Sequence, residues 1–134
     1  MLKLTDFIID CPDTMGLAAF YAEVTGLEIK PESNDFWAGI RFGDFELAFY
    51  RDENHKPPTW PGDEHPKQYH LDFEVDEFEP EHDRVVELGA TFQKSFVNDE
   101  GYGWQVYTDP AGHLFCLCRN PGVAWVDGRL VWPK

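Results

Sequence analysis

The hydrophobic and polar positions at the start of the chain predict a strand followed by a helix. Residues Leu2–Cys11 are rich in β-branched and aromatic side chains and stop at a proline, which is typical of a strand. Asp13 or Thr14 can cap the start of the following helix, and Gly26 can end it. Apolar residues recur every three or four positions in between, which is the spacing of one buried helix face: Leu17, Phe20, Tyr21 and Val24.

Three further strands are expected before the pattern changes. Gly43 and Asp44 are placed to form the tight turn between the last two. The stretch Arg51–Lys67 is mostly polar and holds several prolines, so we interpret it as a surface linker in which Trp60 anchors the loop. The expected strands are Leu27–Lys30, Phe36–Phe42, with its even-numbered residues towards the core, and Phe45–Tyr50.

The second half of the chain repeats this order of elements. Gln68–Val75 alternates strictly, with Leu71 and Phe73 on one face and His70 and Asp72 on the other. Pro80 opens a short helix that Gly89 ends. Three strands follow, at Thr91–Phe96, Trp104–Thr108 and His113–Arg119.

Residue types also match between the two halves, which indicates an internal duplication. The matched pairs are Asp6 with His70, Gly26 with Gly89, Trp37 with Trp104, and Gly43 with Gly112. The predicted fold is therefore α+β, with two βαβββ modules that form one curved mixed sheet around a cavity and helices on the convex side. A single domain over 1–134 is expected: module one at about 2–50, a linker at 51–67, module two at about 68–119 and a tail at 120–134. Asp127 and Gly128 predict a hairpin in that tail.

Charge narrows the range of partners. The 134 residues carry a net charge of −14, from 11 Lys and Arg against 25 Asp and Glu. A charge of that sign repels phosphate backbones and anionic lipids, so nucleic acid and membrane surfaces are not expected partners. The three cysteines, Cys11, Cys116 and Cys118, are interpreted as reduced thiols of a cytoplasmic protein. His55, His65 and His82 lack ligand spacing and are interpreted as surface residues.

Several short segments resemble the vicinal oxygen chelate superfamily, which includes glyoxalase I, bleomycin-resistance proteins and extradiol dioxygenases. The resemblance covers about residues 2–119 and is strongest to the glyoxalase-like branch. The segments that carry it, in family order, are Asp10–Asp13, Ala19–Tyr21, Thr25–Leu27, Trp60-Pro61, His70–Asp76, Leu88–Ala90 and Asp109–His113.

The resemblance implies ligand positions for a divalent metal on the first and last strand of each module. In this chain those positions hold Asp6 and His70 on the first strands, Cys116 on one last strand, and Ala48 or Leu47 on the other. Alanine and leucine bind no metal, and the remaining three donors form a mixed set suited at best to zinc-like ions. No metal or other cofactor is therefore predicted.

Strand alternation predicts which side chains line the cavity. The expected binding residues are Asp6, Trp37, Glu46, Tyr50, His70, Trp104 and Cys116. His70 and Asp72 are the strongest catalytic candidates, although a hydrogen-bonded strand histidine explains the same pattern. Aromatic side chains beside acids suggest that the cavity prefers a neutral or cationic aromatic compound to an anionic one.

Three functions are compatible with these features. The first is a protein that binds a small organic molecule without a full metal site, and we expect this one because the ligand pattern is incomplete. The second is a lyase, isomerase or dioxygenase that works with an unusual metal set or by acid–base chemistry. The third is an interaction module with a vestigial cleft. Relatives of this fold commonly pair, and the tail Val123–Trp132 is apolar, so a homodimer is expected.

Overall fold

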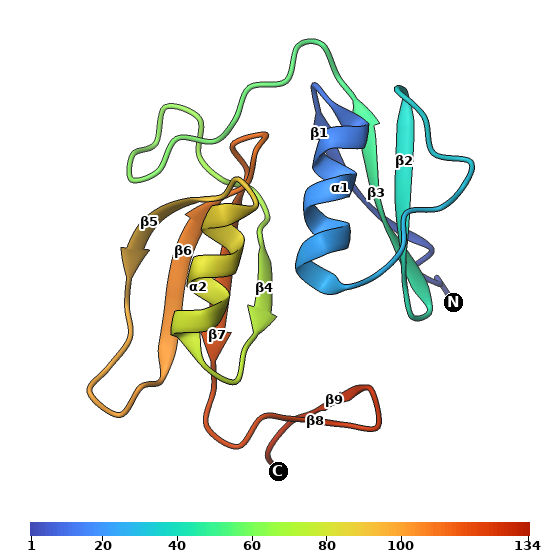
Figure 1. Ribbon diagram of the computed structural model, residues 1–134. Coiled ribbons are helices and arrows are strands. Elements are labelled where there is room, and N and C mark those ends of the chain that lie inside the picture. Colours follow the sequence, from blue (N-terminus) through green and yellow to red (C-terminus); the bar gives the residue numbers. More distant parts are fainter.

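Two sheets, each with one helix against it, and a C-terminal hairpin make up the computed structural model of residues 1–134 (Figure 1). Module one contains β1 (Asp6–Cys11), α1 (Thr14–Thr25), β2 (Trp37–Phe42) and β3 (Phe45–Arg51). Module two contains β4 (Leu71–Glu74), α2 (Phe78–Glu87), β5 (Thr91–Ser95), β6 (Gly103–Thr108) and β7 (Leu114–Arg119). The predicted tail hairpin is present as β8 (Ala124–Val126) and β9 (Arg129–Val131).

The helix ends follow from local sequence chemistry. Asp13 caps α1, and its side chain accepts a hydrogen bond from the backbone N–H of Gly16 at 3.0 Å. Gly26 ends α1 with a left-handed φ of 73°. The prediction that Pro80 opens α2 is wrong, because α2 begins two residues earlier at Phe78. Pro80 lies in the first turn, where a backbone N–H has no partner within the helix, so the proline costs nothing there.

The duplication predicted from the sequence is confirmed by the strand pairing. The strand orders are β1-β3-β2 in module one and β4-β7-β6-β5 in module two, and the first and last strands of each module run parallel. The register also matches, since Ile8 pairs with Ala48 in module one and Asp72 pairs with Cys116 in module two. This match makes Ala48, rather than Leu47, the counterpart of Cys116.

Two details of the predicted sheet are wrong. The modules form separate sheets with no hydrogen-bonded ladder between them, instead of one continuous sheet. The strand expected at Leu27–Lys30 is reduced to a single bridge between Ile29 and Ile40, so module one has three strands where module two has four. Ile29 is the counterpart of β5 in position along the chain, but it contributes only one pair to the sheet edge.

One hydrophobic core joins the two modules. Side chains of both sheets and both helices belong to the same buried cluster, including Phe49 from β3, Phe115 from β7 and Val85 from α2. Tyr21 of α1 stacks on Phe49 with ring centroids 5.7 Å apart and lies edge-on to Phe115 at 6.2 Å. Helix α1 therefore packs against both sheets, and the modules share a core although they share no ladder.

A buried polar contact also crosses between the modules. The hydroxyl of Tyr21 donates a 2.6 Å hydrogen bond to a carboxylate oxygen of Asp109, in the turn between β6 and β7. The other carboxylate oxygen accepts hydrogen bonds from the backbone N–H groups of Ala111 and His113. Burial raises the pKa of Asp109 above its usual range, and burial and the Asp109 charge raise the pKa of Tyr21.

Neither helix has the length and hydropathy of a membrane span.

Candidate functional site

The predicted site residues lie on the faces of the two sheets that point away from the core, here called the open face. Leu47 and Phe49 of β3 and Phe115 and Leu117 of β7 point into the core, so their alternate neighbours point to the open face. Strand register places these predicted residues there: Asp6, Trp37, Glu46 and Tyr50 from module one, and Asp72, Trp104 and Cys116 from module two. His70 precedes β4 and meets Asp72 on the same face.

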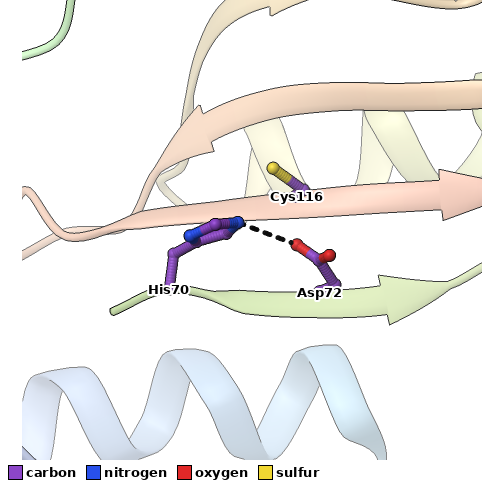
Figure 2. Close-up of side chains that lie close together, drawn as sticks. All are labelled: His70, Asp72 and Cys116. Carbon is purple, nitrogen blue, oxygen red and sulfur yellow. Dashed lines mark ion pairs between the residues drawn. The ribbon is translucent and has the colours of Figure 1, made fainter. Parts of the chain in front are cut away.

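On module two, three of these side chains come together. His70 Nε2 lies 3.3 Å from Asp72 Oδ1, and the Sγ atom of Cys116 completes a cluster whose ligand-type atoms all lie within 4.8 Å of one another. Figure 2 shows His70 and Asp72 pointing towards each other, with Cys116 on the neighbouring strand β7 and α1 beyond the outer edge of β4. Asp72 can therefore orient the imidazole of His70.

The thiols on this face are not nucleophiles at neutral pH. Burial, with the charge of Asp72 as the second cause, raises the pKa of Cys116 from 9.0 to about 12. Burial and the same carboxylate raise the pKa of Cys118 to about 12 as well. Since only the thiolate attacks, Cys116 acts in this cluster as a small buried side chain and a weak hydrogen-bond donor.

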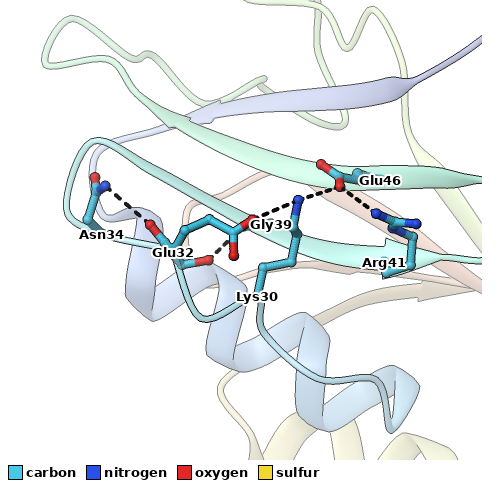
Figure 3. Close-up of polar contacts among 7 residues, drawn as sticks. Lys30, Glu32, Asn34, Gly39, Arg41 and Glu46 are labelled. Carbon is cyan, nitrogen blue, oxygen red and sulfur yellow. Dashed lines mark hydrogen bonds and ion pairs between the residues drawn. The ribbon is translucent and has the colours of Figure 1, made fainter.

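On module one, the predicted acid already has partners within the chain. Glu46 Oε1 lies 2.5 Å from Lys30 Nζ and 3.3 Å from an Arg41 guanidinium nitrogen, as Figure 3 shows. The hydrogen bond from Lys30 holds the pKa of Glu46 below its usual range. The Lys30 ammonium also sits 5.4 Å from the ring centroid of Trp37. Glu46 and Trp37 are therefore engaged with Lys30 rather than free for a ligand.

The predicted aromatic residue of module two, Trp104, packs against another ring. Trp104 stacks on Phe96 with ring centroids 5.3 Å apart and is 47% exposed. Trp60 of the linker packs edge-on to Phe96 and against the small buried cluster of the open face that contains Cys116. Trp60 is therefore the loop anchor that the sequence predicts, and it covers part of module two.

A cavity of about 420 Å³, here called the seam cavity, lies between β1, the linker and the start of β4. Its apolar lining includes Phe7, Ile9, Tyr69, Leu71 and Leu114. Its ionisable lining consists of Asp10, Asp52, His55, Lys56, Lys67, Tyr69, His70 and His113, with Tyr21 at its buried end. His70 is the one predicted site residue in this lining, and it links the cavity to the cluster on module two.

A second cavity of about 570 Å³ lies by the C-terminal hairpin. Its lining includes Val24, Phe42, Arg84 and Trp125, and none of the predicted site residues. The seam cavity is the smaller of the two, but it is the one that contains a predicted functional side chain and a set of convergent polar groups, which is the usual composition of a ligand site.

Sequence reasoning missed His55 and His113 as site residues. His55 belongs to the linker and His113 begins the approach to β7, yet their ring centroids lie 4.7 Å apart at the seam cavity. Interpreting His55 as an ordinary surface residue is wrong, because its ring is half-buried and lies within hydrogen-bond distance of the Ala111 carbonyl oxygen at 3.1 Å. No local pattern indicates this contact, since the linker's path sets it.

The donors do not fit the four-ligand metal site that the sequence resemblance implies. His70, Asp72 and Cys116 all come from module two. The module-one counterparts of Asp72 and Cys116 are Ile8 and Ala48, which offer no ligand atom, and Asp6 is not a member of the cluster. Tetrahedral N, O and S donor sets bind zinc, but only with the thiol deprotonated, and the surroundings of Cys116 oppose deprotonation.

Comparisons with known proteins agree on the architecture. A sequence model of the glyoxalase-like domain matches residues 6–118. The structure is similar to a glyoxalase-related enzyme from Fulvimarina pelagi, with 18% identity, 100% of both chains covered and a TM-score of 0.75. It is also similar to a glyoxalase/bleomycin resistance protein/dioxygenase family enzyme from Burkholderia phytofirmans PsJN, with 18% identity, 88% of this chain and 98% of that chain covered, and a TM-score of 0.68.

A third similar structure is a bleomycin-binding protein complexed with bleomycin, with 19% identity, 90% of this chain and 99% of that chain covered, and a TM-score of 0.57. A sequence search of curated proteins finds no match. At these identities the structural likeness establishes the fold alone.

Proposed function

The chain belongs to the glyoxalase-like domain family, and from that premise we propose that it binds a small organic molecule with an aromatic body, without a full metal site. The observation that carries the proposal is the seam cavity. Its volume of about 420 Å³ is within the range of roughly 300–1,000 Å³ usual for small-molecule sites.

The lining of the cavity supports an aromatic ligand. Phe7 and Tyr69 lie edge to face with ring centroids 6.4 Å apart, and both line the cavity beside Leu71 and Leu114. Rings and branched aliphatic side chains make favourable contact with a flat apolar body. Another protein of similar fold, the bleomycin-binding protein, is complexed with an organic molecule, which supports the binding of a small organic molecule by this chain.

Fewer of the predicted binding residues line the seam cavity than the sequence suggests. His70 stays in the proposal as a wall of the cavity, with Asp72 and Cys116 behind it. Asp6, Trp37, Glu46, Tyr50 and Trp104 lie on the open face but outside the cavity lining. They stay predictions for a ligand that extends beyond the seam.

A second candidate function, acid–base catalysis on the bound molecule, is favoured by one observation. The 3.3 Å approach of Asp72 Oδ1 to His70 Nε2 orients an imidazole at the wall of the cavity. An oriented imidazole can remove and return a proton next to a carbonyl group. Proton exchange from a bound carbonyl compound in heavy water, measured by NMR, should be faster with the parent protein than with His70→Gln if this function is real.

Binding can be tested by filling the cavity. Ile8 lines the cavity and is 53% exposed, so Ile8→Trp adds volume there without disturbing the core. The probes are three compounds of one shape and different charge, namely benzoate, benzamide and benzamidine. Amide chemical shifts of the labelled protein should move around Phe7 and Leu71 for at least one probe, and Ile8→Trp should weaken that binding about tenfold or more.

Val86→Trp is the matched control, because Val86 is 42% exposed on α2 and outside the cavity lining. This variant should bind the probe like the parent. Equal binding by the parent and Ile8→Trp, or no response to any of the three probes, would contradict the proposed function.

A further inference from the structure

The seam cavity lacks the excess of acidic side chains that the whole chain carries. Two of the 11 Lys and Arg residues and three of the five histidines line it, against two of the 25 Asp and Glu residues. The lysines are Lys56 and Lys67, and the charge of Lys67 reaches as far as Cys116, whose pKa it lowers against the larger effect of burial. Basic side chains are therefore concentrated at this one cavity of an acidic protein.

Two of the three histidines have a fixed orientation. His55 Nε2 lies 3.1 Å from the Ala111 carbonyl oxygen, and His113 Nε2 lies 2.7 Å from the Asp10 carbonyl oxygen. A carbonyl oxygen only accepts hydrogen bonds, so Nε2 carries the proton in both rings. The Nδ1 atom is then the position at which each ring takes up a second proton.

The two rings are close enough to act together. Their centroids lie 4.7 Å apart at an angle of 43°. Two positive rings at that separation repel each other, and an anion bound beside both relieves the repulsion while accepting a hydrogen bond from each. Proton uptake by the pair and anion binding should therefore favour each other.

The charged groups around the pair come from every neighbouring element. They are Asp10 at the end of β1, Asp52 and Lys56 in the linker, and Asp109 in the turn before His113. Asp52 already accepts a hydrogen bond from the backbone N–H of Asn54 at 2.8 Å. Asp109 is buried and accepts from Tyr21, Ala111 and His113, so its oxygens are occupied within the chain.

The sequence predicts a neutral or cationic ligand because of acidic side chains on the open face, and two of these acids have basic partners within the chain. Glu46 faces Lys30 and Arg41, and Asp72 faces His70. That preference stays a prediction for the open face, where Asp6 lies. The lining of the seam cavity has as many lysines as aspartates, together with three histidines.

We propose that the seam cavity takes a small organic anion, an aromatic carboxylate, whose charged group binds beside His55 and His113 while its apolar body contacts Phe7, Leu71 and Leu114. This inference rests on the proposed function and adds the chemical class of the ligand and the side chains that select it. Affinity increases as the pH falls, because a protonated imidazole pair attracts an anion more strongly than a neutral pair does.

The experiment compares benzoate, benzamide and benzamidine by isothermal titration and NMR at about pH 6 and about pH 8. Benzoate should bind tightest of the three, and about tenfold or more tighter at the lower pH. The double variant His55→Gln with His113→Gln keeps a side-chain N–H for each carbonyl oxygen but takes up no proton. It should fold like the parent by its amide spectrum and should lose the pH dependence of benzoate binding.

His65→Gln is the control, because His65 belongs to the linker but not to the cavity lining; it should retain the pH dependence. If benzamide or benzamidine binds in the cavity more tightly than benzoate, this inference is wrong, although the proposed function is still supported. An unchanged pH dependence in the double variant would overturn it as well. If none of the three compounds binds, both proposals are wrong.

Discussion

The open faces of the two modules differ more than their backbones do. Strand register aligns them residue for residue, so that Ile8, Ala48 and Gly39 of module one correspond to Asp72, Cys116 and Val106 of module two. At these positions module two carries two members of the polar cluster, Asp72 and Cys116, and a valine, whereas module one carries an isoleucine, an alanine and a glycine.

Different side chains cover the open faces of the two modules. The Trp37 ring lies over Gly39, where a β-carbon would sit 2.5 Å from the ring. Over module two, the linker residue Trp60 packs against the cluster containing Cys116, and the seam cavity opens beside His70. The core-facing positions pack alike in both copies, whereas the open-face positions differ. The cluster of His70, Asp72 and Cys116 therefore lies on module two. Module one contributes side chains of β1 to the lining of the seam cavity.

The largest effect is expected where the two copies are still alike, in the shared core. Phe115 and its counterpart Leu47 are 0% and 2% exposed. Phe115→Ala should lower the free energy of unfolding by about 3–5 kcal/mol and Leu47→Ala by about 2–5 kcal/mol. Because both side chains belong to one cluster, each variant should unfold in a single transition by calorimetry. Two separate transitions in either variant would show that the modules are stabilised independently.

Exchanging Gly39 of module one and its counterpart Val106 of module two should show that different side chains cover the two open faces. Gly39→Val gives module one the residue of module two, and its β-carbon collides with the Trp37 ring. This variant should lose about 1–3 kcal/mol of stability in urea titrations, since the ring must shift. The reverse change, Val106→Gly, removes a buried side chain without a collision. A Gly39→Val variant as stable as the parent would show that Trp37 does not close this face.

Alkaline pH should destabilise the fold through its buried thiols, one of which, Cys116, occupies the open-face position that Ala48 holds in module one. Cys116 keeps its proton in the folded protein up to about pH 12, whereas the unfolded chain loses it above about 9. Its contribution to stability is therefore complete below pH 9 and decreases as the pH rises from there, by about 1.4 kcal/mol per pH unit.

Cys116→Ala gives module two the residue of module one and should flatten that decrease. The measurement is the slope of unfolding free energy against pH between about 9 and 11. Cys11→Ala provides a comparison, because burial raises the pKa of the Cys11 thiol of β1 to about 11, and this thiol should contribute a similar slope. A slope unchanged in Cys116→Ala would mean that this thiol is already ionised in the folded protein.

The C-terminal hairpin belongs to neither copy, and its removal should leave both folded. We propose that it pairs the chain with a second copy, because the side chains of Trp125, Val126, Val131 and Trp132 are about half exposed or more. Without residues 123–134 the sedimentation coefficient should fall to that of a monomer, with little change in the melting temperature. A parent protein that sediments as a monomer at about 10 μM would contradict the proposal.

Local periodicity explains what the sequence could predict. Alternation along Phe45–Tyr50 assigned both faces of β3 correctly, because a strand turns each successive side chain to the other side. The same reasoning failed at Phe36, which is 62% exposed beneath the Arg51 guanidinium, 4.3 Å from the ring centroid. Phe36 precedes the first residue of β2, so the alternation of the strand does not extend to it.

The candidate site could be predicted only in part for a related reason. His70, Asp72 and Cys116 share a face because β4 and β7 pair in parallel, and the duplication made that pairing predictable. The seam cavity depends on how the linker crosses between the modules, which no repeat or period encodes. His55 and His113 meet only through that crossing, and the ionic partners of Glu46 depend on where Lys30 lies after the lost strand.

The position of β3 and β7 inside their separate sheets has a consequence for hydrogen exchange. Each is flanked on both sides, β3 by β1 and β2, and β7 by β4 and β6. Their amides should be the slowest to exchange with deuterium, in two protected regions far apart in the chain. A common free energy of opening for both regions would identify one cooperative unit built from two sheets, and the short β8–β9 pair should exchange long before either.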